Sequence, residues 1–519
     1  MGYYLLGPSL VYAQKTSWEK YQRAGVQAYK QGRYAEAEKQ LTTALGEAEL
    51  LGLPEQRLMI SLMTLALVYS AQDQPERAEP LYQRVLLIRE RTLGPTHLEV
   101  AAALDSLAEV YEAQGQYARA LHLYQRALAI RERTLKPTNP GIASSLENVA
   151  SVYEAQGQYA LAEPLYQRVL SLREKTLKPQ DPKIAASLHN LAELYRVQQR
   201  FPEAEALHKR ALVLRERAFG SYHSSVATSL HSLALVYAGQ GRYDQSEALQ
   251  QRAVAVAERA LGPEHPDVAG MLNSLSELYR SIGQYGKAEP LQQRALGMRE
   301  RVLGSDHPDT ASSRNNLAAI YEAQGQPGKA ESLYQGALIA REKALGPDHP
   351  DLAASLHSLA ELYRLQARYD KAEPLYLRAM ATWQQHREGH QLELAACLNN
   401  LAELYRLQRQ YRKAEPLALR ALAIRERVFG PDHTDVATSL MTLGLLYVSE
   451  AQYDKAEPLY LRAMVTAEKI LGPEHVGLAA VLENYALLLH QTKRDTEALT
   501  MQARARAMRA RPGLSSAAR

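Results

Sequence analysis

Cysteine, phenylalanine, tryptophan and long apolar runs are scarce in this chain of 519 residues, and the scarcity excludes several classes of site. The one cysteine, Cys397, allows neither an internal disulfide nor a metal cluster built on cysteine thiolates. No apolar run reaches the ~18 residues that a membrane span needs, so we expect no integral membrane segment. The 61 basic and 57 acidic side chains are interleaved, so we expect no basic stripe and no nucleic-acid partner.

The first sixteen residues contain a short apolar stretch, residues 3–13, that ends in Val11-Tyr12-Ala13. Small or aliphatic residues at these places are typical of a signal peptidase site, but no Lys or Arg precedes the stretch. Residues 1–16 are therefore either a secretory signal that has lost its basic front or an N-terminal tail. We favour the first interpretation, which predicts a periplasmic or secreted protein, whereas the second predicts a cytoplasmic one.

A repeat of 42 residues runs through most of the chain without insertion or deletion. Its clearest marker is a glycine preceded by Leu or Phe, found at Gly94, Gly220, Gly262, Gly304, Gly346, Gly430 and Gly472. A fixed period of this length is typical of repeat proteins, in which each unit packs only against its neighbours.

Each period predicts two amphipathic helices joined by a tight turn. Leu104, Leu107 and Tyr111 follow the 3, 4 spacing of one helix face, and Gly115 interrupts the pattern. A second apolar stripe follows at Tyr117, Ala120, Tyr124, Ala127 and Leu128. Because neither helix can bury its stripe alone, neighbouring hairpins must stack.

The sequence therefore predicts an all-α solenoid of about twelve helix-turn-helix hairpins over residues 17–511. We expect a capping box from Thr16 to Glu19 to open the first hairpin. Residues 512–519 are predicted to be a disordered C-terminal tail.

The positions from Leu104 to Ala127 match the tetratricopeptide consensus, although the period exceeds the usual 34 residues. The stretch LNNLAELYRLQRQYRKAEPLALRALAIRERVFGPDH, residues 398–433, resembles the repeats of kinesin light chains. The resemblance implies a right-handed superhelix whose concave face takes extended peptides of partner proteins. The near-identical units are also similar to those of bacterial proteins, so we expect a bacterial source. Kinesin light chains carry heptads before their repeats; none precedes residue 17 here, so we do not expect binding to the motor heavy chain.

In tetratricopeptide folds, the groove would be lined by residues beside the apolar stripe of each first helix. Asparagine recurs there, and its amide offers both a donor and an acceptor to a peptide backbone. Glutamate recurs too, often with arginine three residues later. The candidate groove residues are Asn148, Asn190, Glu193, Arg196, Asn273, Glu277, Arg280, Asn315, Asn316, Glu361, Arg364, Asn399, Asn400, Glu403 and Arg406.

Other interpretations of these rows remain open. Asparagine can simply lie on a solvated helix surface, and a Glu–Arg pair at this spacing adds only about 0.2–0.5 kcal/mol of helix stability. Upstream, Glu112 and Glu154 replace the arginines, so we expect a groove that is acidic in its first third. Trp383 replaces a usual arginine, either as an exposed anchor for a partner or as drift in one copy.

A histidine recurs ahead of most first helices, at His97, His223, His265, His307, His349, His433 and His475. Copies on successive hairpins are separated by about 10 Å, so they cannot converge on one metal ion. We expect them to pack in loops or to cap helices. With no catalytic motif in the sequence, we expect no enzyme activity, no cofactor and no metal.

The predicted function is a scaffold that binds extended peptide segments of other proteins in its concave groove. The alternative is an assembly platform or a regulatory subunit of an enzyme or signalling complex, which would use its outer face or its end repeats.

Overall fold

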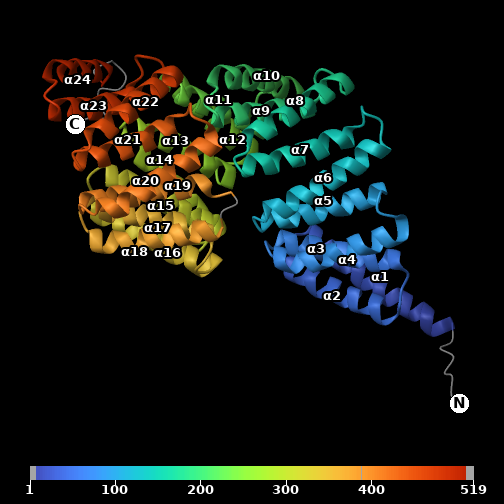
Figure 1. Cartoon of the computed structure of the whole chain (residues 1–519). Helices are drawn as coiled ribbons and strands as arrows, with labels where there is room; N and C mark the ends of the chain where they lie inside the picture. The colour runs from blue at the N-terminus through green and yellow to red at the C-terminus, as the bar shows by residue number, and fades with distance from the viewer. Residues whose placement is uncertain (1–7, 387–388, 510–519) are drawn as a thin grey trace. The chain divides into compact units, whose positions relative to one another are not determined.

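Helical hairpins make up nearly all of the part of the chain that the computed structural model describes, residues 8–386 and 389–509 (Figure 1). In these ranges there is no strand, and twenty-four α-helices follow one another as twelve hairpins. The predicted all-α solenoid of about twelve hairpins is thereby confirmed. The predicted C-terminal tail lies outside the described residues.

The chain forms two units, Met1–Thr176 (unit 1) and Leu177–Arg519 (unit 2), and each is described by itself. The helices of unit 1 are α1 Pro8–Lys30, α2 Tyr34–Leu50, α3 Glu55–Ala71, α4 Pro75–Leu93, α5 Leu98–Ala113, α6 Tyr117–Thr134, α7 Pro140–Ala155 and α8 Tyr159–Thr176. Because α1 begins at Pro8, Thr16 lies inside a helix, and the predicted capping box is wrong.

Unit 2 contains eight hairpins and one 3₁₀ turn, Val476–Leu478, ahead of α23. Its helices are α9 Pro182–Val197, α10 Phe201–Phe219, α11 Ser224–Gly239, α12 Tyr243–Leu261, α13 Pro266–Ser281, α14 Tyr285–Leu303, α15 Pro308–Ala323, α16 Pro327–Leu345, α17 Pro350–Leu365, α18 Tyr369–Gln385, α19 Gln391–Leu407, α20 Tyr411–Phe429, α21 Thr434–Ser449, α22 Tyr453–Leu471, α23 Ala479–Gln491 and α24 Asp495–Arg509.

The turn inside each hairpin follows from a left-handed residue after the first helix. In the α5–α6 hairpin, Gly115 has a φ of 69°. Its amide donates to the carbonyl of Glu112, and the amide of Gln116 donates to that of Tyr111, which together form a Schellman motif. The break that the sequence placed at Gly115 is therefore the turn itself.

The recurrent loop histidines cap the first helices, as the sequence analysis expected. In each of the seven, the side chain accepts a hydrogen bond from the backbone N–H two residues later. Nδ1 of His349, for example, lies 3.1 Å from the amide nitrogen of Asp351. Asn139 and Asp181 do the same at α7 and α9. Each histidine therefore satisfies a free N–H at the start of its own helix.

Tyrosine outnumbers phenylalanine, 31 to 3, because the hydroxyl of a recurrent tyrosine ties one hairpin to the previous one. Near the end of α17, the ring of Tyr363 is buried and its hydroxyl donates to Glu331 of α16 at 2.8 Å. Tyr405 and Glu373 repeat this contact one hairpin later at 2.9 Å. Phenylalanine would fill the same space but leave the glutamate without this donor.

Trp383 is buried, with 2% of its surface exposed, so the interpretation of an exposed anchor is wrong. One repeat earlier, the same two positions hold Arg341 on α16 and Ser355 on α17, whose side chains hydrogen-bond at 2.7 Å. Here Trp383 and Cys397 replace them, and both belong to the apolar core. An apolar pair has therefore taken the place of a buried polar pair.

Unit 2 curves so that its first helices lie on the inner side. The first helices α13 and α15, α17 and α19, and α19 and α21 contact each other, and in the described residues no neighbouring second helices do so to a similar extent. The curve also brings α21 back to α9, six hairpins apart. Gln199 donates to Thr434 at 2.6 Å, and Nε2 of His433 lies 3.3 Å from the carbonyl oxygen of Val197.

Candidate functional site

The candidate site is the inner surface of unit 2, defined by the polar side chains that the first helices carry beside their buried stripes. The predicted residues on it are Asn190, Glu193, Arg196, Glu277, Arg280, Asn316, Glu361, Arg364, Asn400, Glu403 and Arg406. All are at least partly accessible. Asn273 instead stands at the repeat position of Asn315 and Asn399, and it accepts hydrogen bonds from Gln292 of α14 and Asn316 of α15.

Every Glu–Arg pair predicted from the three-residue spacing is an ion pair in the structure. Nε of Arg196 lies 2.6 Å from Glu193, and Nε of Arg406 lies 2.7 Å from Glu403. A third pair joins Arg280 to Glu277, and the fourth joins Arg364 to Glu361 at 2.5 Å. The side chain of Arg364 is only 15% exposed, so this pair is more sheltered than a freely solvated surface pair.

The electrostatics of Glu361 show how firmly these carboxylates are held. Burial works to raise its pKa, but hydrogen bonds from Arg364 and Tyr376 outweigh burial and lower the pKa below its usual range. The same ion pair raises the pKa of Arg364. Both groups are therefore charged at neutral pH and have a fixed geometry.

Two asparagines of the inner surface bridge successive first helices. Nδ2 of Asn400 on α19 donates to Glu361 on α17 at 3.2 Å. Nδ2 of Asn316 on α15 donates to Oδ1 of Asn273 on α13 at 2.6 Å. Nδ2 of Asn400 also lies 3.2 Å from Nε2 of His357. Each amide in addition carries a carbonyl oxygen, which can accept a hydrogen bond from a ligand.

Asn315 and Asn399 lie between hairpins, whereas the next residues, Asn316 and Asn400, lie on the inner surface. Asn399 is 4% exposed and donates to Ser439 of the next hairpin at 3.1 Å. Asn315 repeats this contact with Ser355, also at 3.1 Å. The next first helix covers this side of each helix, so the prediction that Asn399 faces an open groove is wrong, and Asn400 is the residue that lies on the surface.

Unit 1 carries one predicted groove residue, Asn148 on α7, which is partly buried. Acidic side chains gather on the neighbouring α5. Burial raises the pKa of Glu109, and the charges of Asp105 and Glu112 raise it further. Hydroxyls bind the two glutamates that interrupt the arginine row: Tyr124 donates to Glu112, and Tyr166 donates to Glu154.

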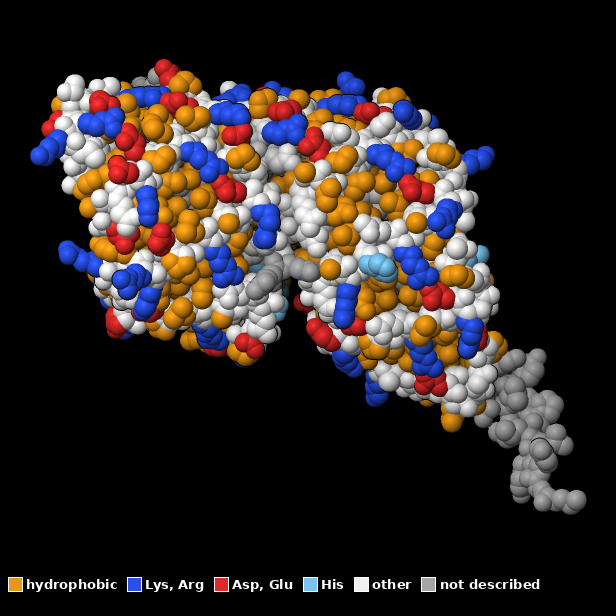
Figure 2. Space-filling view, in the orientation of Figure 1, with side chains coloured by type: hydrophobic (Ala, Val, Ile, Leu, Met, Phe, Trp, Pro, Cys, Tyr) orange, Lys and Arg blue, Asp and Glu red, His pale blue; other side chains and the backbone are white. Residues whose placement is uncertain are grey.

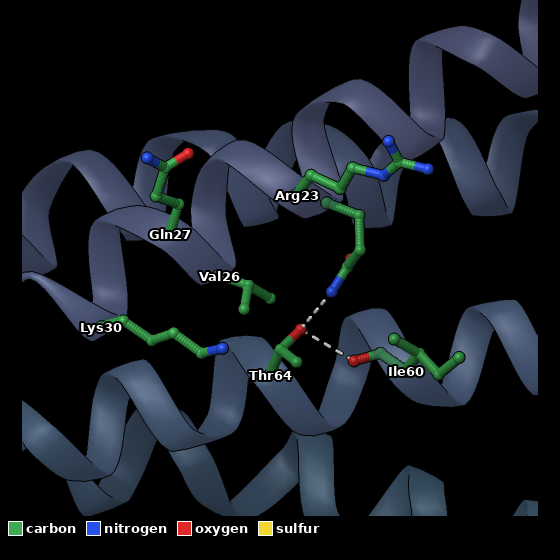
Figure 3. Close-up of a pocket in the computed structure, with 7 residues that line it drawn as sticks. Arg23, Val26, Gln27, Lys30, Ile60 and Thr64 are labelled. Atoms are coloured by element: carbon green, nitrogen blue, oxygen red, sulfur yellow. Dashed lines mark hydrogen bonds between the residues drawn. The ribbon is translucent and has the colours of Figure 1, made fainter.

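Unit 1 also has a shallow pocket between α1 and α3, with a volume of about 370 Å³ (Figure 3). Gln22 donates to Thr64 across it at 2.8 Å. The pocket is lined by Gln22, Arg23, Val26, Gln27, Lys30, Ile60 and Thr64, so its charged groups are basic. The expected acidic character therefore does not extend to the first hairpin.

Sequence reasoning missed one group of side chains with the chemistry of metal ligands. His189, Glu193 and His208 place donor atoms within 4.8 Å of one another, and no second group of this kind occurs among the described residues. The metal-site hypothesis rejected from the sequence concerned only the histidines of the loops.

The outer surface of unit 2 carries a short row of exposed leucines. Leu377, Leu419 and Leu461 occupy the same position on α18, α20 and α22 and are 39%, 45% and 40% exposed. Figure 2 shows hydrophobic side chains mixed with charged ones over the face in view. None of the described helices combines the length and apolar character needed to cross a membrane.

Comparison with known proteins identifies the repeats. The sequence profile described as "Tetratricopeptide repeat" matches residues 57–133, 141–217, 183–259, 225–301, 267–338, 309–385, 393–464 and 447–511. No curated protein matches the chain.

Three solved structures illustrate the similarity. The putative kinesin light chain nearly identical TPR-like repeats from Podosopora anserina are 28% identical, with a TM-score of 0.36 over 40% of this chain and 97% of that chain. BtubC (BKLC) from P. vanneervenii is 27% identical, with a TM-score of 0.38 over 44% of this chain and 92% of that chain. A Rap protein complexed with competence and sporulation factor is 13% identical, with a TM-score of 0.44 over 72% of this chain and 98% of that chain.

The repeat matches cover most of the chain from residue 57 to residue 511 and coincide with the hairpins described above. Repeats of this kind generally form scaffolds for protein–protein interaction. The chain belongs to the tetratricopeptide repeat family.

Proposed function

We propose that the chain is a non-enzymatic scaffold that binds extended segments of partner proteins along the inner surface of unit 2. The observation that carries the proposal is the fixed row of polar groups on α15, α17 and α19. Arg364 and Arg406 occupy the same position on successive first helices, and Asn316 and Asn400 lie on the same surface.

This arrangement suits an extended peptide backbone better than one compact ligand. The side chains recur from helix to helix, as the peptide groups of an extended segment recur along its length. Glu361 and Glu403 already hold the two guanidinium groups, so little side-chain freedom is lost when a peptide binds. Affinity would then come from many modest contacts on a surface that is already ordered.

The test is selection of binding peptides from a displayed random library, followed by affinity measurement with two variants. The inner variant combines Arg364→Gln, Arg406→Gln and Asn400→Ala. The control combines Arg412→Gln and Arg420→Gln, which removes the same charge from exposed positions of α20. Circular dichroism checks that both variants keep the wild-type helix content.

We expect the inner variant to bind selected peptides at least about tenfold more weakly, since one lost hydrogen bond to a charged group costs about 1.5–3 kcal/mol. The control should bind as the wild type does. Equal affinity of all three proteins would contradict the proposal.

The exposed leucine row favours a second candidate, an assembly platform that uses the outer surface. Apolar side chains that recur at one position of three successive second helices can together form a docking stripe. A variant with Leu377→Gln, Leu419→Gln and Leu461→Gln separates the two functions. If it loses a partner that the inner variant keeps, the outer surface is the working surface.

A further inference from the structure

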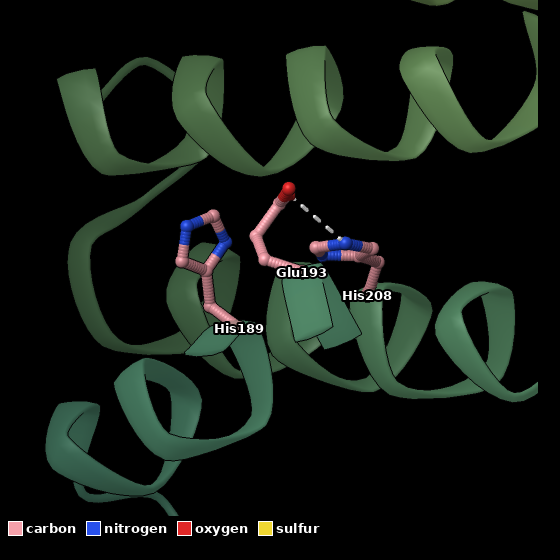
Figure 4. Close-up of side chains that lie close together, drawn as sticks. All are labelled: His189, Glu193 and His208. Carbon is pink, nitrogen blue, oxygen red and sulfur yellow. Dashed lines mark ion pairs between the residues drawn. The ribbon is translucent and has the colours of Figure 1, made fainter. Parts of the chain in front are cut away.

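Three potential metal ligands converge inside the first hairpin of unit 2 (Figure 4). His189 and Glu193 lie one helical turn apart on α9, and His208 reaches them from α10. Their donor atoms lie within 4.8 Å of one another, and the two imidazole rings are 5.5 Å apart between centroids.

Four polar atoms of this cluster lack the hydrogen bonds that buried groups normally make. The His208 side chain is fully buried, and neither of its ring nitrogens has a hydrogen-bond partner. Nδ1 of His189 and Oε1 of Glu193 are also without one. Nε2 of His208 approaches Oε1 of Glu193 to 3.3 Å, but the two are not aligned as a hydrogen bond.

The α17–α18 hairpin shows how the same positions are satisfied elsewhere. His357 and Glu361 stand where His189 and Glu193 stand, but Tyr376 takes the place of His208. The hydroxyl of Tyr376 donates to Glu361, so that carboxylate has a protein donor. Tyrosine also holds this position at Tyr124, Tyr166, Tyr334 and Tyr460. Histidine at residue 208 places a ring nitrogen, which can bind a metal ion, where these hairpins carry a tyrosine hydroxyl.

We propose that His189, Glu193 and His208 bind a divalent transition-metal ion of the Zn²⁺ type through two imidazole nitrogens and one carboxylate oxygen. Two histidines and one carboxylate are a common ligand set for zinc, and three protein ligands leave the fourth position open. His189 and Glu193 are partly accessible, which gives the ion a route to the site.

The charges around the cluster prepare these groups for a cation. Nε of Arg196 holds Oε2 of Glu193 at 2.6 Å, which leaves Oε1 for the ion. Burial would raise the pKa of Glu193, but His208 and Arg196 lower it below its usual range, so the group is a carboxylate. Burial lowers the pKa of His189 to about 4, so its ring is neutral at physiological pH. Two cations, Arg196 and Arg215, affect the electrostatics of the cluster. The carboxylate of Glu193 forms an ion pair with Arg196 and so offsets its charge.

The spacing of the donor atoms is compatible with closure around an ion. Ligand atoms at about 2.1 Å from a tetrahedral zinc lie about 3.4 Å from one another. The donor atoms of the cluster lie within 4.8 Å of one another. Side-chain rotations that move a donor atom by about 1 Å would therefore bring the cluster to that geometry.

The experiment titrates the untagged full chain with Co²⁺ and with Zn²⁺ at about pH 7.5. Co²⁺ reports its coordination through visible absorption, and isothermal titration gives the affinity and stoichiometry of Zn²⁺. The test variants are His208→Tyr and His189→Asn, because other hairpins carry tyrosine and asparagine at these positions and fold with them. The control is His357→Asn, which removes the equivalent histidine from a hairpin that lacks the second imidazole.

We expect the wild type and His357→Asn to bind one ion with the visible spectrum of four-coordinate Co²⁺. Both test variants should bind at least about 100-fold more weakly, since even a partner outside the first coordination shell is worth about 10- to 100-fold. Zn²⁺ should raise the thermal midpoint of the wild type but not that of His208→Tyr. Absence of a stoichiometric site in the wild type, or equal binding by the His208→Tyr variant, would overturn the proposal.

Discussion

Two tyrosines of unit 2 are equally buried but differ in one hydrogen bond. Tyr376 on α18 donates to Oε2 of Glu361 at 2.5 Å, and its side chain is fully buried. Tyr460 on α22 is as deeply buried, yet its hydroxyl has no hydrogen-bond partner among the described residues. Leu445 stands where Glu361 would be, so the acceptor is missing. The pair allows the contribution of this hydroxyl to be measured in matched surroundings.

Replacing either tyrosine with phenylalanine removes the same oxygen atom. Tyr376→Phe loses a hydrogen bond to a charged group, which costs about 1.5–3 kcal/mol. Tyr460→Phe instead removes a buried hydroxyl that has no partner, so it should be neutral or stabilise unit 2 by up to about 1 kcal/mol. We therefore expect the free energies of unfolding of the two variants to differ by about 1.5–4 kcal/mol.

Urea-induced unfolding of the full chain, followed by far-UV circular dichroism, measures this difference. The slopes with denaturant should match, so that the midpoints can be compared directly. In a Glu361→Gln background the cost of Tyr376→Phe should fall, because the charged acceptor has gone. If both substitutions cost the same, or Tyr460→Phe costs more, the stabilising role assigned to the hydrogen bond between Tyr376 and Glu361 is refuted.

Three further substitutions test a buried pair of side chains, a helix cap and the protonation of a buried histidine. Trp383→Arg should destabilise unit 2 by about 3–5 kcal/mol because it buries an unpaired charge, and adding Cys397→Ser should recover part of that loss in a double-mutant cycle of thermal unfolding. His349→Ala should cost about 0.5–2 kcal/mol through loss of the α17 cap, whereas His349→Asn should cost little, since Asn139 caps α7 in the same way; equal losses in urea titrations would contradict this role. Burial lowers the pKa of His357, so the unfolded chain binds a proton more readily than the folded chain, and the free energy of unfolding should fall as the pH drops below about 6.5. His357→Asn should flatten that part of the profile of stability against pH, and an unchanged profile would count against the assignment.

The fold could be predicted from the sequence because the 42-residue period of the sequence is also the length of one helical hairpin with its loops. The 42-residue repeat fixes the hairpin count, and Gly115 marks a turn that requires a left-handed backbone. The start of α1 could not be placed in this way, because the apolar stretch before residue 17 resembles a targeting segment and continues as helix from Pro8.

The candidate site was predicted less completely, because helical geometry gives a direction but not the neighbour that lies there. Spacing alone located the Glu–Arg pairs, since both partners belong to one helix. It could not show that the next hairpin covers Asn399, nor that Trp383 is buried where other hairpins hold an arginine. His208 left a signal in the sequence, as a histidine in a column of tyrosines, but its meaning depends on the distance to His189 on another helix.

The central claim is that partner segments lie along the inner surface of unit 2, and thiol footprinting tests it most directly. The one native cysteine, Cys397, is buried, so a single introduced cysteine can be labelled selectively. Ser358→Cys places a thiol on the inner surface between Asn316 and Asn400, and Arg420→Cys places one on exposed α20. The labelling rate of each variant is measured with and without a selected peptide. The account predicts that the peptide slows labelling at residue 358 and leaves residue 420 unchanged; protection at residue 420 alone, or at neither position, would contradict it.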